Sequence, residues 1–147
     1  MESATNDAMK IAHISGHYDL TDAEFEEHYR HQIDDAIEHG DHFIVGDANG
    51  ADVAAQQYLF ARLGDGGRVH VYHMLDKPRH NAGFPTVGGF ESDELRNETM
   101  TARSDYDIAW VRPGFEKAGT ARNLARRLRQ VATVDGKAPA RPRSFVR

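Results

Sequence analysis

The chain has 147 residues, a length that suits one domain built around one hydrophobic core. Hydrophobic residues make up 39 % and charged residues 28 %, as in ordinary globular proteins, and no stretch approaches the roughly 18 apolar residues of a membrane span. The chain contains no cysteine, which excludes disulfides, thiolate catalysis and cysteine-ligated zinc, and which fits a cytoplasmic location.

Strand and helix patterns alternate along the chain. The predicted strands are residues 10–15, 42–47, 68–75 and 106–113, and the predicted helices are residues 21–39, 50–63, 91–104 and 118–131. Thr21 and Glu24 have the spacing of a capping box at the start of the first helix. In the third helix, the pattern places Leu95, Thr99 and Ala102 on the inward face. Residues 76–90 show no periodicity and contain several Gly and Pro, so we expect a long functional or mobile loop there.

This order of elements predicts an α/β fold. We expect a Rossmann-like three-layer αβα sandwich with a mainly parallel sheet of four or five strands. We expect residues 10–131 to form a single domain, residues 1–9 a flexible N-terminus and residues 132–147 a basic tail.

Charge is unevenly distributed along the chain. The segment from Lys117 to the end carries nine Lys or Arg against one acidic residue, whereas the rest of the chain is acidic. The basic segment is either a solvated helix face with a tail or a site for anions. Because the acidic body would repel a long polyanion, the pattern favours a small phosphate ligand over nucleic acid.

The candidate ligand site lies where the strands end, because ligands of such sheets bind beyond the carboxyl ends of the strands. The candidate binding residues are Ser15, Gly16 and His17 after the first strand, Asp47, Gly50 and Asp52 after the second, and Pro113, Gly114, Gly119 and Thr120 after the fourth. The hydroxyl, imidazole and helix-start N–H groups suit a phosphate, and the carboxylates suit sugar hydroxyls. Taken singly, each group also fits an ordinary turn or helix cap.

The stretch "RNETMTARSDYDIAWVRPGFEKAGT" resembles the Lonely Guy family pattern. The matching positions are Arg96, Met100, Asp105, Pro113, Gly114, Gly119 and Thr120. "SGHYDLTD" and "GDANGAD" are similar to the opening motifs of small bacterial proteins in the wider SLOG superfamily, so the resemblance covers roughly residues 10–130.

The resemblance implies a nucleotide-related function. It implies a Rossmann-like protein that binds nucleotides or nucleotide-derived ligands, often as a homodimer. Some members hydrolyse the N-glycosidic bond of nucleoside monophosphates, and others are thought to sense nucleotides. We expect no cofactor, and no tight metal-binding motif occurs among the nine histidines.

One position departs from the family pattern. Asn123 stands where the pattern has a glutamate that acts in cleavage together with the arginine matched by Arg96. An amide cannot stabilise a developing sugar cation as an anion does, nor act as a base. Another acid would then have to take that role, and the candidates are Glu116, Glu98, Asp47 and Asp52.

Among these acids, Glu116 is the first choice, because related deoxyribosyltransferases and deoxynucleotide hydrolases use a glutamate near this loop. Glu116 and Arg96 are therefore the predicted catalytic residues, and Asn123 is kept among the binding residues. We expect hydrolysis or transfer at the N-glycosidic bond of a nucleoside monophosphate. The alternative is a non-catalytic nucleotide-binding or sensing module of the SLOG type.

Overall fold

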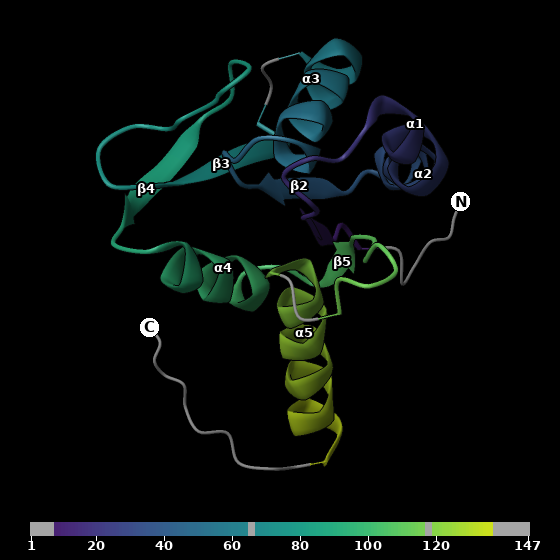
Figure 1. The fold of residues 1–147 in the computed structure, drawn as a ribbon, viewed down its shortest axis with the longest axis vertical. Helices are drawn as coiled ribbons and strands as arrows, with labels where there is room; N and C mark the ends of the chain where they lie inside the picture. The colour runs from purple at the N-terminus through teal and green to yellow at the C-terminus, as the bar shows by residue number, and fades with distance from the viewer. Residues whose placement is uncertain (1–7, 65–66, 117–118, 137–147) are drawn as a thin grey trace.

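The computed structural model describes residues 8–64, 67–116 and 119–136 and forms one five-stranded sheet (Figure 1). The strands are β1 (Ile11–Ile14), β2 (His42–Val45), β3 (Val69–Met74), β4 (Thr86–Phe90) and β5 (Tyr106–Ile108). They lie in the order β4-β3-β2-β1-β5, and every pairing is parallel. The predicted Rossmann-like α/β fold is confirmed.

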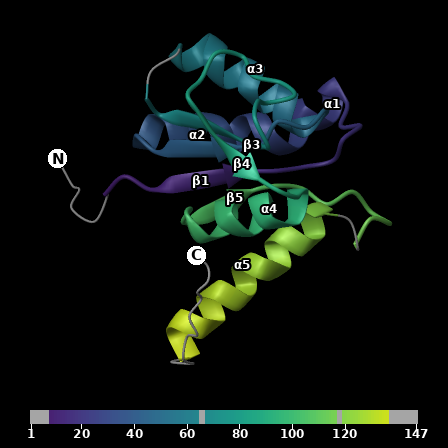
Figure 2. The same ribbon diagram turned by 90° about the vertical axis from the view of Figure 1, so that its left-hand side faces the viewer.

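Helices cover both faces of the sheet. They are α1 (Asp22–Phe25), the π-helical segment η1 (Glu26–Arg30), α2 (His31–His39), α3 (Ala51–Leu63), α4 (Asp93–Ala102) and α5 (Gly119–Gly136). Figure 2 shows α1, α2 and α3 on one side of the strands and α4 and α5 on the other, which gives three layers. α5 continues five residues past the predicted end at residue 131. The rest of the predicted basic tail, residues 137–147, and residues 1–7 lie outside the described part of the chain.

The sheet is buried on both faces, as expected for parallel strands between helices. Ala12 and Ile14 of β1 have no exposed surface and belong to the main apolar cluster, which includes Tyr29 of η1. A second, smaller cluster joins Ile44 of β2 to Met100 of α4. The side chains of β1 that lie between these apolar positions therefore face α4 and α5.

Two strands differ from the sequence predictions. The predicted loop 76–90 contains β4, an edge strand that pairs with β3. Its two adjacent glycines interrupt the residue pattern that is typical of a strand. A glycine is required at position 88, because a Cβ there would overlap the ring of His73. The last predicted strand, 106–113, is much shorter, because β5 ends at Ile108.

The inward face of α4 also differs from the prediction. Leu95 is 47 % exposed, whereas Arg96 and Met100 are buried. The buried stripe of α4 therefore includes a charged residue, which hydrophobic periodicity does not reveal.

The strand order places a topological switch point at β1. From β1 the chain builds outward through β2 and β3 to β4, and it then returns to the other side of β1 to form β5. In open α/β sheets such a reversal leaves a crevice beyond the carboxyl ends of the adjacent strands. No helix in the described residues combines the length and apolarity needed to cross a membrane.

Candidate functional site

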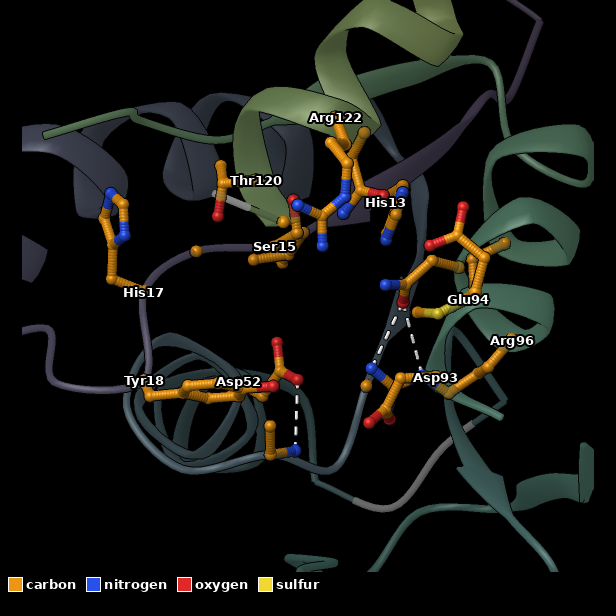
Figure 3. Close-up of a pocket in the computed structure, with 18 residues that line it drawn as sticks. His13, Ser15, His17, Tyr18, Asp52, Asp93, Glu94, Arg96, Thr120 and Arg122 are labelled. Atoms are coloured by element: carbon orange, nitrogen blue, oxygen red, sulfur yellow. Dashed lines mark hydrogen bonds and ion pairs between the residues drawn. The ribbon is translucent and has the colours of Figure 1, made fainter. Parts of the chain in front are cut away.

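A cavity of about 210 Å³ opens at the carboxyl end of β1 (Figure 3). Its lining residues come from four segments: residues 13–18, 46–52, 93–100 and 119–123. These segments are the end of β1 with the turn that follows, the turn from β2 into α3, the first turns of α4 and the first turn of α5. We call it the strand-end cavity.

Many of the predicted site residues meet in the strand-end cavity. Those that line it are Ser15, Gly16, His17, Asp52, Arg96, Gly119, Thr120 and Asn123. They are far apart in sequence and converge because the strands after which they lie are parallel.

The remaining predicted residues lie outside this lining. Glu116 is exposed, and its Oε2 accepts a hydrogen bond of 3.2 Å from the backbone N–H of Gly114. Pro113 and Gly114 are also exposed. Gly50 packs against the turn after β1, where a Cβ would overlap the backbone oxygen of His17. The structure therefore does not bring Glu116 together with Arg96.

Asp47 is buried behind the cavity wall and holds two arginines. Its Oδ1 accepts hydrogen bonds of 2.7 Å from Arg96 Nη1 and from Arg79 Nη2. Burial alone would raise the pKa of Asp47, but the hydrogen bonds and charge of Arg79, together with the charge of Arg96, outweigh it and lower the pKa. Asn97 Oδ1 accepts further hydrogen bonds from Arg96, so the guanidinium is fixed in one orientation beside the cavity.

One end of the strand-end cavity suits an anion. Gly119 and Thr120 begin α5, whose first N–H groups have no partners within the helix. The hydroxyl of Ser15 is buried at the same cavity and has no hydrogen-bond partner among the described residues. Arg122, from the first turn of α5, also lines the cavity. The start of α5, the Ser15 hydroxyl and the Arg122 guanidinium therefore all line the strand-end cavity.

Asp52 places a carboxyl group on the opposite wall. It is 7 % exposed and lies in the first turn of α3, where its Oδ2 accepts a hydrogen bond of 3.1 Å from Ala48 N–H. Figure 3 shows this bond, with the other carboxyl oxygen directed into the cavity. Burial raises the pKa of Asp52 to about 6, and the nearby charge of Arg96 opposes this shift without cancelling it. A carboxyl group that titrates near neutral pH is typical of functional sites.

A buried tyrosine connects the ends of β1 and β5 beside the cavity. Tyr29 Oη donates a hydrogen bond of 2.8 Å to the backbone oxygen of Ser15 and accepts one of 3.1 Å from Trp110 N–H. Gly16 must be a glycine here, because a Cβ would overlap Tyr29 Oη. Tyr29 lies in η1, and π-helical turns often occur next to functional sites.

Another contact holds the β5 side of the cavity wall. His17 Nε2 accepts a hydrogen bond of 2.9 Å from Arg112 N–H, and Arg112 also pairs with Glu24 of α1. The turn after β1 is therefore fixed to the segment after β5.

Sequence reasoning missed several lining residues. One of them, His13, lies on β1. The others are Asp93, Glu94 and Asn97 in the first turns of α4 and Arg122 in the first turn of α5. Acidic residues commonly follow the N-cap of a helix, so Asp93 and Glu94 of α4 could not be distinguished from an ordinary helix start. His13 had a signal, because it lies two residues before Ser15 and therefore on the same face of the strand.

The fold and this cavity define a Rossmann-like α/β protein with a polar pocket at the topological switch point. Comparisons with protein-family models, curated proteins and solved structures found no match. Membership of the SLOG superfamily therefore stays a prediction from sequence motifs. In the part of the chain that the structure describes, no group of three or more His, Asp or Glu side chains is arranged to hold a metal ion.

Proposed function

We propose that the protein binds a nucleoside monophosphate or a related nucleotide in the strand-end cavity and hydrolyses or transfers its N-glycosidic bond, as a SLOG-type protein. This proposal rests on one observation: the cavity has groups that suit an anion on one wall and a carboxyl group on the opposite wall. One wall offers the start of α5 and the unpartnered hydroxyl of Ser15, and the other offers the buried carboxyl group of Asp52. A sugar phosphate needs both kinds of group.

The phosphate would lie at the start of α5. Backbone N–H groups at a helix N-terminus and the partial positive charge of the helix dipole stabilise phosphate dianions. Ser15 would donate its hydroxyl proton to a phosphate oxygen, which gives this buried group the hydrogen bond that it otherwise lacks. Arg122 would supply a positive charge at the same place.

The sugar would lie against Asp52. A cavity of about 210 Å³ is smaller than the roughly 300–1,000 Å³ of pockets that enclose whole drug-sized ligands, so the sugar phosphate would lie inside and the base at the opening. When the N-glycosidic bond breaks, positive charge develops on the sugar. The Asp52 carboxylate would stabilise that charge in a place screened from water.

Asp52 thus replaces Glu116 as our candidate for the acid that the family pattern places at Asn123. Asp52 is buried in the cavity wall, whereas Glu116 is exposed and bonded to Gly114 N–H. Arg96 is kept in the proposal as a positioning residue for ligand oxygens, since its guanidinium is fixed by Asp47 and Asn97.

A non-catalytic nucleotide-binding module is the second candidate. It is favoured by Asn123, which lines the cavity and whose Oδ1 accepts a hydrogen bond of 2.6 Å from Arg126 Nη1. This amide is already engaged in joining two turns of α5. Both candidates use the same cavity and ligand, and they differ in whether base is released. The homodimer that the resemblance implies stays a prediction.

The test is to incubate the purified protein with the common ribo- and deoxyribonucleoside monophosphates and measure free base by chromatography. Asp52→Asn should lower the rate of base release by about 10²- to 10³-fold, the range found when a group that stabilises transition-state charge is removed. Asp22→Asn is the matched control, because Asp22 is an exposed aspartate in the first turn of another helix, α1. Its rate should equal that of the wild type.

The possible results separate the two candidates. Tight binding without release of any base would favour the binding module. Neither binding nor release across the whole set would contradict both. Equal rates for Asp52→Asn and wild type would leave the glycosidic activity but remove Asp52 from its mechanism.

A further inference from the structure

His13 is a buried titratable side chain at the strand-end cavity, outside the family pattern. It is 1 % exposed and lines the cavity from β1, on the same face of the strand as Ser15. Figure 3 shows its imidazole projecting into the cavity. A histidine in this place is within reach of a ligand bound between Ser15 and Asp52.

Asp107 lies directly behind His13. The two residues are register partners in the parallel pairing of β1 with β5, so their side chains are neighbours on one face of the sheet. Asp107 Oδ1 lies 3.3 Å from His13 Nδ1, and no described group completes a hydrogen bond to that nitrogen. The carboxylate therefore faces Nδ1, the fully buried ring nitrogen, so Nε2 is the nitrogen that can meet a ligand in the cavity.

Arg127 fixes Asp107 in turn. Its Nε donates to Asp107 Oδ2 at 3.2 Å, and its Nη1 donates to the backbone oxygens of Thr101 and Ser104. These bonds attach α5 to the end of α4 and to β5. His13, Asp107 and Arg127 form a buried row that leads from the cavity into the protein, which we call the His13 row.

The His13 row favours a neutral imidazole with its proton on Nδ1. The charged groups that face His13 are Asp107 from β5, Arg127 from α5 and Arg96 from α4. Burial lowers the pKa of His13, and Asp107, which acts in the opposite direction, does not offset it. The Asp107 carboxylate attracts the remaining proton to Nδ1, so Nε2 is left as an acceptor on the cavity side.

We propose that His13 is a catalytic general base that removes a proton from the attacking water, and that Asp107 is its positioning residue. This inference rests on the proposed glycosidic activity. The water oxygen forms a bond to the anomeric carbon while its proton passes to His13 Nε2. The C1′–N bond breaks, and its electron pair goes to the base nitrogen. The base takes up one proton from solvent, and His13 returns one to solvent, so the sum is nucleoside monophosphate plus water giving sugar phosphate plus free base.

The test is the pH dependence of base release in three variants and the wild type. His13→Gln should lower kcat by about 10²- to 10⁴-fold with little change in KM, the range expected for loss of a general base. His70→Gln is the matched control, since His70 is a half-buried histidine of β3 outside the cavity lining, and it should match the wild type. His13→Asn serves as a second variant if the glutamine does not fold, because an asparagine amide can still donate to Asp107.

Asp107→Asn separates a positioning role from a purely structural one. Because the Asp107 charge raises the pKa of His13, its removal should move the acid limb of the kcat profile to lower pH while it lowers kcat. The comparison is made in the Asp52→Asn background, because the Asp52 carboxyl, whose pKa is raised to about 6, would otherwise contribute to the same limb. A structural role would change the unfolding midpoint and leave that limb in place. Circular dichroism would establish that each variant is folded.

The outcomes distinguish this inference from the function on which it rests. If the wild type releases no base from any nucleotide, the proposed activity and the role of His13 are both overturned. If the wild type releases base and folded His13→Gln does so at the same rate and with the same pH profile, the role of His13 alone is overturned. An acid limb that does not move in Asp107→Asn overturns the positioning role.

Discussion

Two buried carboxyl groups at opposite ends of the same parallel sheet, Asp41 and Asp52, have opposite shifts in pKa. At the amino end, Asp41 is 3 % exposed and accepts hydrogen bonds from Lys10 N–H, His39 Nδ1 and Tyr106 Oη. Burial alone would raise its pKa, but these hydrogen bonds outweigh burial and lower it. At the carboxyl end, Asp52 is buried to a similar degree, yet its pKa is raised to about 6.

This difference extends to the neighbouring polar groups. Beside Asp52, the buried Ser15 hydroxyl has no hydrogen-bond partner among the described residues. Buried polar groups are normally paired, because each unpaired group costs folding free energy. The hydrogen bonds around Asp41 therefore stabilise the fold, whereas Asp52 and Ser15 carry a cost that a ligand would offset. Groups that lower stability in this way cluster at functional sites.

The largest expected effect on stability is a gain from Asp52→Asn. A carboxyl pKa raised from 3.8 to about 6 means that the folded state loses stability as pH rises through about 6. Asparagine avoids this cost, so its advantage in free energy of unfolding should grow by about 2.5 kcal/mol between pH 4 and pH 8. Urea unfolding of both proteins at several pH values measures it. A difference that does not change with pH would contradict the assignment of Asp52.

Asp41→Asn should have the opposite effect, with a loss of about 2 kcal/mol at pH 7, since hydrogen bonds to a charged group each contribute about 1.5–3 kcal/mol. The folded-state pKa of Asp41 is lowered, so its contribution is present above the unfolded pKa and is lost as pH falls through the folded pKa. The same unfolding series tests this prediction. Nucleotide affinity should not change, and a large loss of affinity would break the contrast between the two ends.

Tyr29→Phe tests the connection between β1 and β5. Removal of Oη leaves the backbone oxygen of Ser15 and Trp110 N–H without this partner, which should cost about 1–2 kcal/mol and weaken nucleotide binding. Tyr106→Phe is the matched variant at the amino end, where Oη bonds to Asp41. It should lower stability and leave binding unchanged. Thermal unfolding and titration calorimetry of both variants separate the two effects, and equal binding by both would refute the role of Tyr29.

Ser15→Ala should have the smallest effect on stability, within about 0.5 kcal/mol, because the hydroxyl has no hydrogen-bond partner in the described part of the chain. Affinity for a nucleoside monophosphate should fall by about tenfold, as expected for one hydrogen bond of about 1.4 kcal/mol. Ser104→Ala is the control, since Ser104 Oγ donates to Met100 at 2.6 Å. Calorimetry should find normal nucleotide affinity and lower stability in Ser104→Ala. Normal affinity in Ser15→Ala, or reduced affinity in Ser104→Ala, would contradict the phosphate site.

Most of the fold could be predicted from sequence, because it depends on local patterns. The capping box of Thr21 and Glu24 is present at the start of α1, and Gly40 ends α2 in the left-handed conformation. β4 could not be predicted, because adjacent glycines conceal its pairing with β3. The glycine requirement at Gly88 comes from His73, which is distant in sequence.

The site was predicted in part. Residues directly after the strands, such as Ser15 and Asp52, were placed correctly in one cavity because parallel strands bring their carboxyl ends together. Glu116 was chosen by its position in a loop, and its exposure depends on how the loop folds, which the sequence does not specify. The spacing of His13 from Ser15 places both on one face of β1, but the contact of His13 with Asp107, 94 residues away in the chain, could not be predicted.

The central claim is that the strand-end cavity binds a sugar phosphate between the start of α5 and Asp52. A crystal structure of Asp52→Asn with a nucleoside monophosphate tests it most directly, because that variant should bind the ligand without cleaving it. The account expects phosphate oxygens within hydrogen-bond distance of Ser15 Oγ and the backbone N–H of Thr120, with the anomeric carbon facing residue 52. A nucleotide bound elsewhere, or one whose phosphate points away from α5 into solvent, would contradict it.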